Sequence, residues 1–183
     1  MIDKPPELPG QQAIATAEPY VVVPYVDGKL RDQTTDAVMG WGGSYVFHAL
    51  DPADPYAYAR ALMDWWEARM DLVVIEHDIV PAPGMIGSLL ACAQPWCGHP
   101  YHIGEGRYVY GLGLCKVAAS VMTRLPILAT LAMRNHRGLT TRVPWGSVNE
   151  AFEQQMQRCG YTMHQHTEPV EHLHYPVEPV CGD

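Results

Sequence analysis

Two carboxylates stand two positions apart directly after a run of four apolar residues. The run is Leu72–Ile75, and Glu76, His77 and Asp78 follow it. In extended backbone, side chains at positions i and i+2 point the same way, so both acids can face one ligand. Carboxylate oxygens suit Mg²⁺ and Mn²⁺, cations that proteins often share with substrate phosphates. Glu76 and Asp78 are therefore a candidate divalent-metal site; the alternative is a solvated loop in which both acids face water.

A pair of histidines with the same spacing lies near the C-terminus. His172 and His174 would project to one side of an extended segment, where both imidazoles could face one metal ion or phosphate. His164 and His166 repeat this spacing a few residues earlier. The alternative is therefore an exposed edge segment in a histidine-rich part of the chain.

A further group of potential metal ligands has the spacing C-x4-C-x-H-x2-H. Thiolates and imidazoles are the ligands of structural zinc, and this group supplies four of them: Cys92, Cys97, His99 and His102. The spacing differs from the usual paired motifs, and two prolines divide the stretch into short turns. The alternative is an apolar helix that buries Cys92, followed by an ordinary loop.

One stretch of the chain concentrates basic residues: Arg134, His136, Arg137 and Arg142. Few apolar residues accompany them, which is typical of a loop. Such a loop could close over a bound diphosphate, or it could contact an anionic acceptor. The alternative is a solvated linker between two elements.

Strands and helices are expected to alternate along the chain. The expected strands cover residues 20–23, 44–47, 72–75 and 108–110, with short extended segments at 161–164 and 170–174. The expected helices cover residues 56–70, 116–124 and a capped stretch that begins at Ser147 and ends at Gly160. This order predicts an α/β fold, a single-domain three-layer sandwich with a mostly parallel central sheet. Ligands of such sheets bind at the carboxyl ends of the strands.

Length and composition narrow the class of protein. The 183 residues suffice for one domain, expected over residues 20–175, with an arm at 1–19 and a tail at 176–183. A net charge of −8 disfavours a main role in binding nucleic-acid phosphates. We expect no membrane span, because no apolar run is long enough. Five widely spread cysteines favour a reduced, cytoplasmic setting.

The order of these parts resembles the GT-A glycosyltransferases, family 2-like members in particular, in an abbreviated form. Residues 72–81 look like the strand that carries the family's DxD signature, with glutamate in place of the first aspartate. Residues 110–125 resemble its glycine turn and acceptor-side helix, and residues 145–175 its closing run toward a metal-binding histidine. Residues 21–25 would be the first strand. The resemblance covers residues 20–175 and implies a GT-A-like fold.

The resemblance also implies roles for single residues. Asp78 would bind Mn²⁺ or Mg²⁺ at the donor diphosphate, Glu76 would contact the ribose or the metal, and His172 or His174 would complete the protein ligands. The nucleotide-sugar would further contact Pro24, Tyr25, Gly111 and Gly113. The acidic pair expected at the start of the penultimate helix is missing, so Glu150 is the nearest candidate base, although it also fits the third position of a capping box.

We therefore expect a metal-dependent glycosyltransferase that moves a sugar from a nucleotide-sugar donor to an acceptor hydroxyl. A saccharide acceptor is favoured over a lipid carrier, a protein or a hydroxylated DNA base, the last being disfavoured by the net charge. Two alternatives remain at this point. One is a metal-dependent phosphoesterase that uses the same acids and histidines; the other is a non-catalytic binding protein stabilised by zinc.

Overall fold

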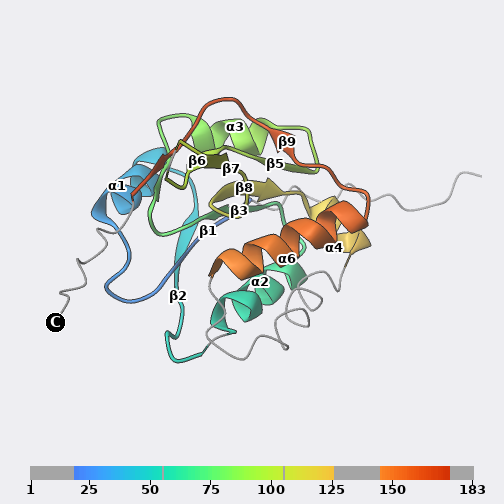
Figure 1. Ribbon diagram of the computed structural model, residues 1–183, viewed down its shortest axis with the longest axis horizontal. Coiled ribbons are helices and arrows are strands. Elements are labelled where there is room, and N and C mark those ends of the chain that lie inside the picture. Colours follow the sequence, from blue (N-terminus) through green and yellow to red (C-terminus); the bar gives the residue numbers. More distant parts are fainter. Residues whose placement is uncertain (1–18, 55, 105, 126–144, 174–183) are drawn as a thin grey trace, which may run out of the picture.

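Six strands form the central sheet of the computed structural model, which describes residues 19–54, 56–104, 106–125 and 145–173 (Figure 1). The strand order is β2 (Tyr45–Ala49), β1 (Tyr20–Tyr25), β3 (Leu72–Ile75), β8 (Leu114–Val117), β5 (Trp96–Gly98) and β9 (His164–Gln165). β1 runs parallel to β2 and β3, and β5 runs parallel to β9, whereas β8 is antiparallel to both of its neighbours. The predicted mostly parallel sheet is confirmed, with one reversed strand near its centre.

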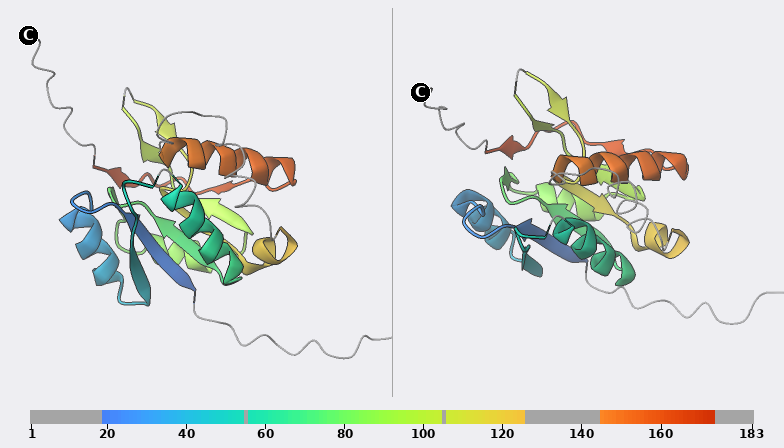
Figure 2. Two further views of the ribbon diagram at one scale, coloured as in Figure 1. Left: turned by 90° about the horizontal axis from the view of Figure 1, so that it is seen from below. Right: turned by 60° about the horizontal axis from the view of Figure 1, so that its bottom comes forward.

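Helices cover both faces of this sheet, as Figures 1 and 2 show. One face carries α2 (Ala57–Glu67), α4 (Ala119–Arg124) and α6 (Trp145–Arg158), and the other carries α1 (Asp32–Trp41) and α3 (Met85–Ala91). Each face has its own hydrophobic cluster. The predicted three-layer α/β sandwich is therefore confirmed.

Strand β3 explains how the two clusters share one sheet. Leu72 and Val74 belong to the cluster under α2 and α6, whereas Val73 and Ile75 belong to the cluster under α1 and α3. All four are at most 1% exposed. Burying such a side chain contributes about 1.5–3 kcal/mol, so a run of apolar residues without alternation is stable only in a strand covered on both sides.

Aromatic side chains join the helices of one face to the sheet. The ring of Phe152 in α6 lies edge-on to Trp66 of α2 and to Trp96 of β5, with 5.9 Å between ring centroids in both pairs. The Trp66 indole nitrogen also donates a hydrogen bond to the Leu125 carbonyl at 2.6 Å. This packing fixes α6 against the sheet.

Two short ribbons lie beside the main sheet. β4 (Ile79–Val80) pairs antiparallel with β10 (Glu171–His172), and β6 (Tyr101–His102) pairs antiparallel with β7 (Tyr108–Val109). An isolated bridge between Tyr101 and Val170 joins the two ribbons. The C-terminal segment is thereby brought next to the residues that follow β3 (Figure 2).

The structure corrects three local predictions. Residues 114–117 form strand β8, so the helix expected over 116–124 begins only at Ala119. Helix α6 begins at Trp145, so Ser147 lies inside the helix rather than at its N-cap. The strand expected at 108–110 pairs with β6 and not with the main sheet.

The predicted end of α6 at Gly160 is confirmed. Gly160 has a φ of 83°, in the left-handed region that glycine adopts without strain. The Tyr161 N–H donates to the Met156 carbonyl at 3.0 Å, which is typical of a helix ended by a glycine.

Several predicted features lie outside the described residues: most of the arm, the tail, His174, and the basic cluster at residues 134–142. Of the helices that the structure does describe, none is long and apolar enough to cross a membrane.

Candidate active site

Asp78 and His172 form the centre of the candidate site. The His172 Nε2 atom lies 3.2 Å from the Asp78 Oδ2 atom, and the two side chains are 15% and 13% exposed. The β4–β10 pairing makes this contact, because it places His172 opposite Ile79. The Leu173 N–H also donates to the Asp78 carbonyl at 2.8 Å. The acidic motif after β3 and the late histidine His172 therefore lie in contact.

The second ring nitrogen of His172 fixes the orientation of the imidazole. Its Nδ1 atom lies 2.6 Å from the His102 carbonyl oxygen. A carbonyl only accepts hydrogen bonds, so Nδ1 carries the proton and Nε2 is directed to Asp78. Metal-binding histidines in proteins commonly have such a carbonyl partner on the nitrogen away from the metal.

The two side chains shift each other's pKa. The hydrogen bond with Asp78 raises the pKa of His172 above its usual value, against the opposing effect of burial. Burial alone would raise the pKa of Asp78, but the hydrogen bond from His172 and the charge of His77 outweigh burial and lower it. The metal-free chain therefore favours an ion pair here.

Glu76 has a different environment from Asp78. Burial raises the pKa of the Glu76 carboxyl to about 7, and the charge of Asp78 acts in the same direction. The Tyr58 hydroxyl donates to Glu76 Oε1 at 3.4 Å, and the Glu76 N–H donates to the Gly113 carbonyl at 2.9 Å. Close to neutral pH, this carboxyl is therefore poised between its protonated and ionised forms.

Glu76 is set back from the Asp78–His172 contact. Within the described ranges, one group of three His, Cys, Asp or Glu side chains has its ligand atoms all within 4.8 Å of one another, and that group is elsewhere. Asp78 and His172 thus supply an oxygen and a nitrogen in direct contact. Glu76 lies farther than 4.8 Å from at least one of them.

Tyr101 and Asn149 support the site, and sequence analysis did not select either of them. The Tyr101 ring is 5% exposed and lies edge-on to the His172 ring, with a centroid distance of 5.4 Å. Asn149 Nδ2 donates to the Tyr101 hydroxyl at 3.0 Å, and Asn149 Oδ1 accepts from the Leu112 N–H at 2.8 Å. These bonds connect α6 to the loop before β8 and to the ring beside His172.

This packing also explains the two glycines of the Gly-x-Gly turn. A Cβ atom at Gly111 would overlap the Asn149 side chain, and one at Gly113 would lie 2.6 Å from the Tyr101 ring. Both glycines are buried. Close approach of side chains therefore requires glycine here, and the expected contact of Gly111 and Gly113 with a nucleotide-sugar stays a prediction.

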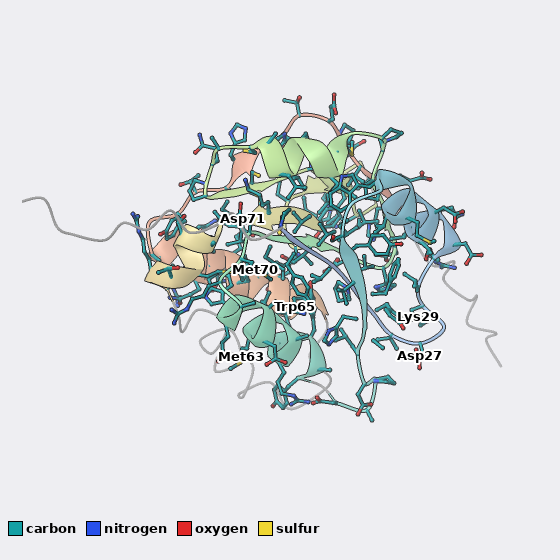
Figure 3. All side chains as sticks on the ribbon, turned by 180° about the vertical axis from the view of Figure 1, so that it is seen from behind. Asp27, Lys29, Met63, Trp65, Met70 and Asp71 are labelled. Atoms are coloured by element: carbon teal, nitrogen blue, oxygen red, sulfur yellow. The ribbon has the colours of Figure 1, made fainter. Side chains whose placement is uncertain are left out.

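Two basic residues lie at the carboxyl end of β1, next to the acidic motif. The Arg31 N–H donates to the His77 carbonyl at 3.2 Å. The pKa of His77 is lowered, mainly by burial and also by the positive charges of Arg31 and Lys29. Figure 3 shows Asp27 and Lys29 well apart from Asp71, which precedes β3 at the opposite end of the sheet. The predicted parallel sheet places the residues that follow β1 and β3 at the same edge. Lys29 and Arg31 follow β1, so this prediction could have selected them as neighbours of the acidic motif.

The remaining predicted residues lie as follows. Pro24 and Tyr25 end strand β1, at the same edge of the sheet as Glu76. Glu150 is exposed on α6, one position after Asn149. Their roles toward a substrate stay predictions.

The structure does not bring together the four residues considered as zinc ligands, Cys92, Cys97, His99 and His102. His99 is engaged on both ring nitrogens, by the Ser88 hydroxyl at 3.1 Å and the Glu168 carbonyl at 2.9 Å. The His102 ring accepts from the Gly106 N–H at 3.1 Å. Of the four residues, only Cys92 belongs to the group with mutually close ligand atoms, and its companions there are His164 and His166.

Comparison with known proteins supports the fold. No family model and no curated protein matches the sequence. Among solved structures, the chain is similar to a glycosyltransferase involved in the glycosylation of the major capsid of PBCV-1, with a TM-score of 0.54, 15% identity and 81% of each chain covered. This likeness confirms the predicted GT-A-like fold.

Two further structures are similar at a TM-score of 0.44. One is A197 from STIV, at 15% identity, covering 57% of this chain and 66% of that one. The other is a candidate nucleotide-diphospho-sugar transferase from Desulfovibrio desulfuricans G20, at 17% identity, covering 83% of this chain and 60% of that one.

Proposed function

We propose that this protein is a metal-dependent glycosyltransferase that moves a sugar from a nucleotide-sugar donor to an acceptor hydroxyl. The observation that carries the proposal is the Asp78–His172 contact at the carboxyl end of β3, in a GT-A-like fold. The PBCV-1 protein with a similar structure is itself a glycosyltransferase, which supports the same reaction class.

The donor set of this site fits Mn²⁺ or Mg²⁺. Asp78 offers carboxylate oxygen, His172 offers an imidazole nitrogen oriented by the His102 carbonyl, and Glu76 stands near as a further carboxylate. A divalent ion held by these residues would supply positive charge to the departing diphosphate.

The protein's own residues have separate tasks in the proposed reaction. The acceptor oxygen bonds to the anomeric carbon, the bond between that carbon and the diphosphate oxygen breaks, and the nucleoside diphosphate leaves. Lys29 and Arg31, near the acidic motif, would bind phosphate oxygens, and Pro24 and Tyr25 would contact the nucleotide. Glu150 would accept the proton of the acceptor hydroxyl.

The acceptor and the setting belong to the proposal as well. A saccharide acceptor fits best, because the net charge of −8 disfavours approach to a polyanion such as DNA. The cytoplasmic location stays a prediction; the four described cysteines are all free of disulfides.

Thermal-shift titration of the full chain with a panel of nucleotide-sugars, each with and without Mn²⁺, tests the function. We expect one donor to raise the melting temperature only when Mn²⁺ is present, and the same donor to be consumed in a transfer assay with saccharide acceptors. Stabilisation by simple phosphoesters with release of phosphate would instead identify a phosphoesterase. No response to any donor with Mn²⁺ would contradict the proposal.

A further inference from the structure

A cysteine and two histidines meet at the edge of the sheet farthest from β2. Cys92 caps the C-terminal end of α3, His164 lies in β9, and His166 follows that strand. Their potential ligand atoms all lie within 4.8 Å of one another. The cysteine and the histidines come from segments more than seventy positions apart, so tertiary packing alone creates the group.

The backbone fixes the two histidines in place. β9 pairs parallel with β5, with His164 opposite Cys97. The His166 N–H donates to the Gly98 carbonyl at 2.9 Å, and the His166 carbonyl accepts from the Tyr110 hydroxyl at 3.2 Å. Backbone hydrogen bonds therefore hold the segment that bears both histidine rings in a defined position, as a metal site requires.

The His166 ring is held from two sides and has a polar atom without a partner. It stacks on His99 at a centroid distance of 4.5 Å and an interplanar angle of 22°, and it meets His164 edge-on at 5.2 Å. Its Nε2 atom is buried, and no described residue hydrogen-bonds to it. An unsatisfied buried nitrogen costs about 1–3 kcal/mol, and a bound metal ion removes that cost.

The charges around the group permit a dication. The Lys116 ammonium, 3% exposed, is engaged by the Cys92 carbonyl, to which it donates a hydrogen bond. Glu168 contributes negative charge beside His166. The Cys97 thiol contacts the Cys92 thiol, but it is not one of the three close ligands. Thiolate with two imidazoles is a donor set of Zn²⁺.

We propose that Cys92, His164 and His166 bind one Zn²⁺ ion, with the fourth tetrahedral position open to water. Binding forms one zinc–sulfur and two zinc–nitrogen bonds, and the Cys92 thiol releases its proton to solvent. The ion ties the two-residue edge strand β9 to the end of α3. β9 leads directly into the segment that carries His172, so the zinc site holds that segment in place from a distance.

Cobalt substitution in the full chain tests this site. The chain is stripped with a chelator under reducing conditions and titrated with Co²⁺ and, in competition with a chromogenic chelator, with Zn²⁺. We expect one equivalent of each to bind, and a thiolate-to-cobalt charge-transfer band that Cys92→Ser abolishes. His164→Ala and His166→Ala should each weaken Zn²⁺ binding at least about tenfold.

Two matched variants control for general damage. Cys159→Ser removes an exposed thiol just after α6, and His102→Ala removes a histidine of the four-residue set considered from sequence; both should keep the band and the zinc affinity. The cobalt spectrum of the unaltered chain tests for a thiolate ligand even if a ligand variant fails to fold. Asp78→Asn should keep the band, which separates this site from the proposed catalytic metal.

Three results would overturn the zinc site. The first is the absence of a charge-transfer band in the reduced, unaltered chain. The second is a band lost in Cys97→Ala and kept in Cys92→Ser. The third is an intact mass showing that the freshly purified chain holds a Cys92–Cys97 disulfide and no zinc.

Discussion

His172 Nε2 lies 3.2 Å from Asp78 Oδ2, although 94 residues separate them in sequence. The contact exists because strand β10 pairs with strand β4, which begins directly after the acidic motif. An acid at a strand end and an imidazole oriented by a carbonyl thus form one polar site, flanked by the buried Tyr101 ring. The predictions below begin from this contact.

Removing either member of the pair should weaken divalent-metal binding. Asp78→Asn keeps the size of the side chain and loses the charge, and His172→Gln loses the imidazole. We expect each to weaken Mn²⁺ binding at least about tenfold and to remove transfer activity. Calorimetric titration of Mn²⁺ measures the first effect. Asp64→Asn, which changes an exposed acid on α2, is the matched control. If Asp78→Asn and His172→Gln both bind Mn²⁺ as tightly as this control, Asp78 and His172 do not form a metal site.

Glu76 should make the stability of the metal-free chain fall as the pH rises toward neutrality. Burial raises its pKa to about 7 from 4.5, so the folded chain holds a proton that the unfolded chain has released. Stability from this group is therefore fully present below pH 4.5 and lost as the pH rises through about 7. Urea unfolding between about pH 5 and about pH 8 should show a decline on the order of 2 kcal/mol more than in Glu76→Gln. Parallel pH profiles of the two proteins would contradict this assignment.

Mn²⁺ affinity should rise with increasing pH, whereas the stability of the metal-free chain should fall. A carboxyl must be ionised to bind Mn²⁺, so protonation of Glu76 competes with the metal as the pH falls below about 7. We expect the loss of Mn²⁺ affinity at acidic pH to be smaller in Glu76→Gln than in the unaltered chain. If both lose affinity equally, Glu76 takes no part in holding the metal.

Gly111→Ala should destabilise the fold by about 1–3 kcal/mol, because the new methyl group overlaps the Asn149 side chain. Asn149 would then lose its bonds to Leu112 and Tyr101. Asn149→Ala removes the same bonds, so the double variant should cost less than the sum of the two single variants. Urea unfolding of all four proteins measures this coupling, and simple additivity would show that the two residues act independently.

Phe152→Ala should cost about 3–5 kcal/mol, because Phe152 joins Trp66 and Trp96 across the layers. Phe152→Leu fills most of the volume and should cost less than about 1.5 kcal/mol. Denaturant midpoints measure both. A small loss for the alanine variant would mean that α6 is held to the sheet by other contacts.

Arg31→Gln should weaken nucleotide-sugar binding about 10- to 100-fold if the guanidinium contacts donor phosphates, the range expected for a charge-assisted hydrogen bond. Because its side chain is only half-buried, a small effect on folding is expected. Donor titration in the presence of Mn²⁺ is the measurement, with Arg158→Gln at the exposed end of α6 as control. Equal donor affinity in Arg31→Gln and Arg158→Gln would show that Arg31 does not contact the donor phosphates.

The sequence by itself determined the elements whose signals are local. Four apolar residues in a row predicted β3 as a strand covered on both faces, and the acid motif followed it at the carboxyl end. The apolar spacing within residues 56–70 predicted α2, and Gly160 predicted the end of α6. Each signal operates through residues a few positions apart, so no knowledge of the remaining chain was needed.

Local sequence patterns did not predict elements whose structure depends on contacts with residues distant in sequence. Helix α1 has no side-chain cap and buries only Thr34 and Val38, so its sequence pattern is weak. Lys116 was expected at the start of a helix, but it is buried in strand β8 with its ammonium bonded to the Cys92 carbonyl. A buried charge is tolerated when tertiary structure brings it an acceptor, and such an acceptor has no mark in the sequence.

The same distinction separates the two polar sites. Residue type and position after β3 selected the acidic motif, and the structure places Asp78 against His172 while Glu76 contacts Tyr58; the spacing of Cys92, Cys97, His99 and His102 does not bring those four side chains together. His99 and His102 are satisfied by nearer partners, while Cys92 meets His164 and His166. Sequence spacing fixes where side chains point within one element. Tertiary pairing decides which elements become neighbours: β10 pairs with β4 outside the main sheet and brings residues 78 and 172 together, and β9 pairs with β5 and brings residue 166 next to residue 92.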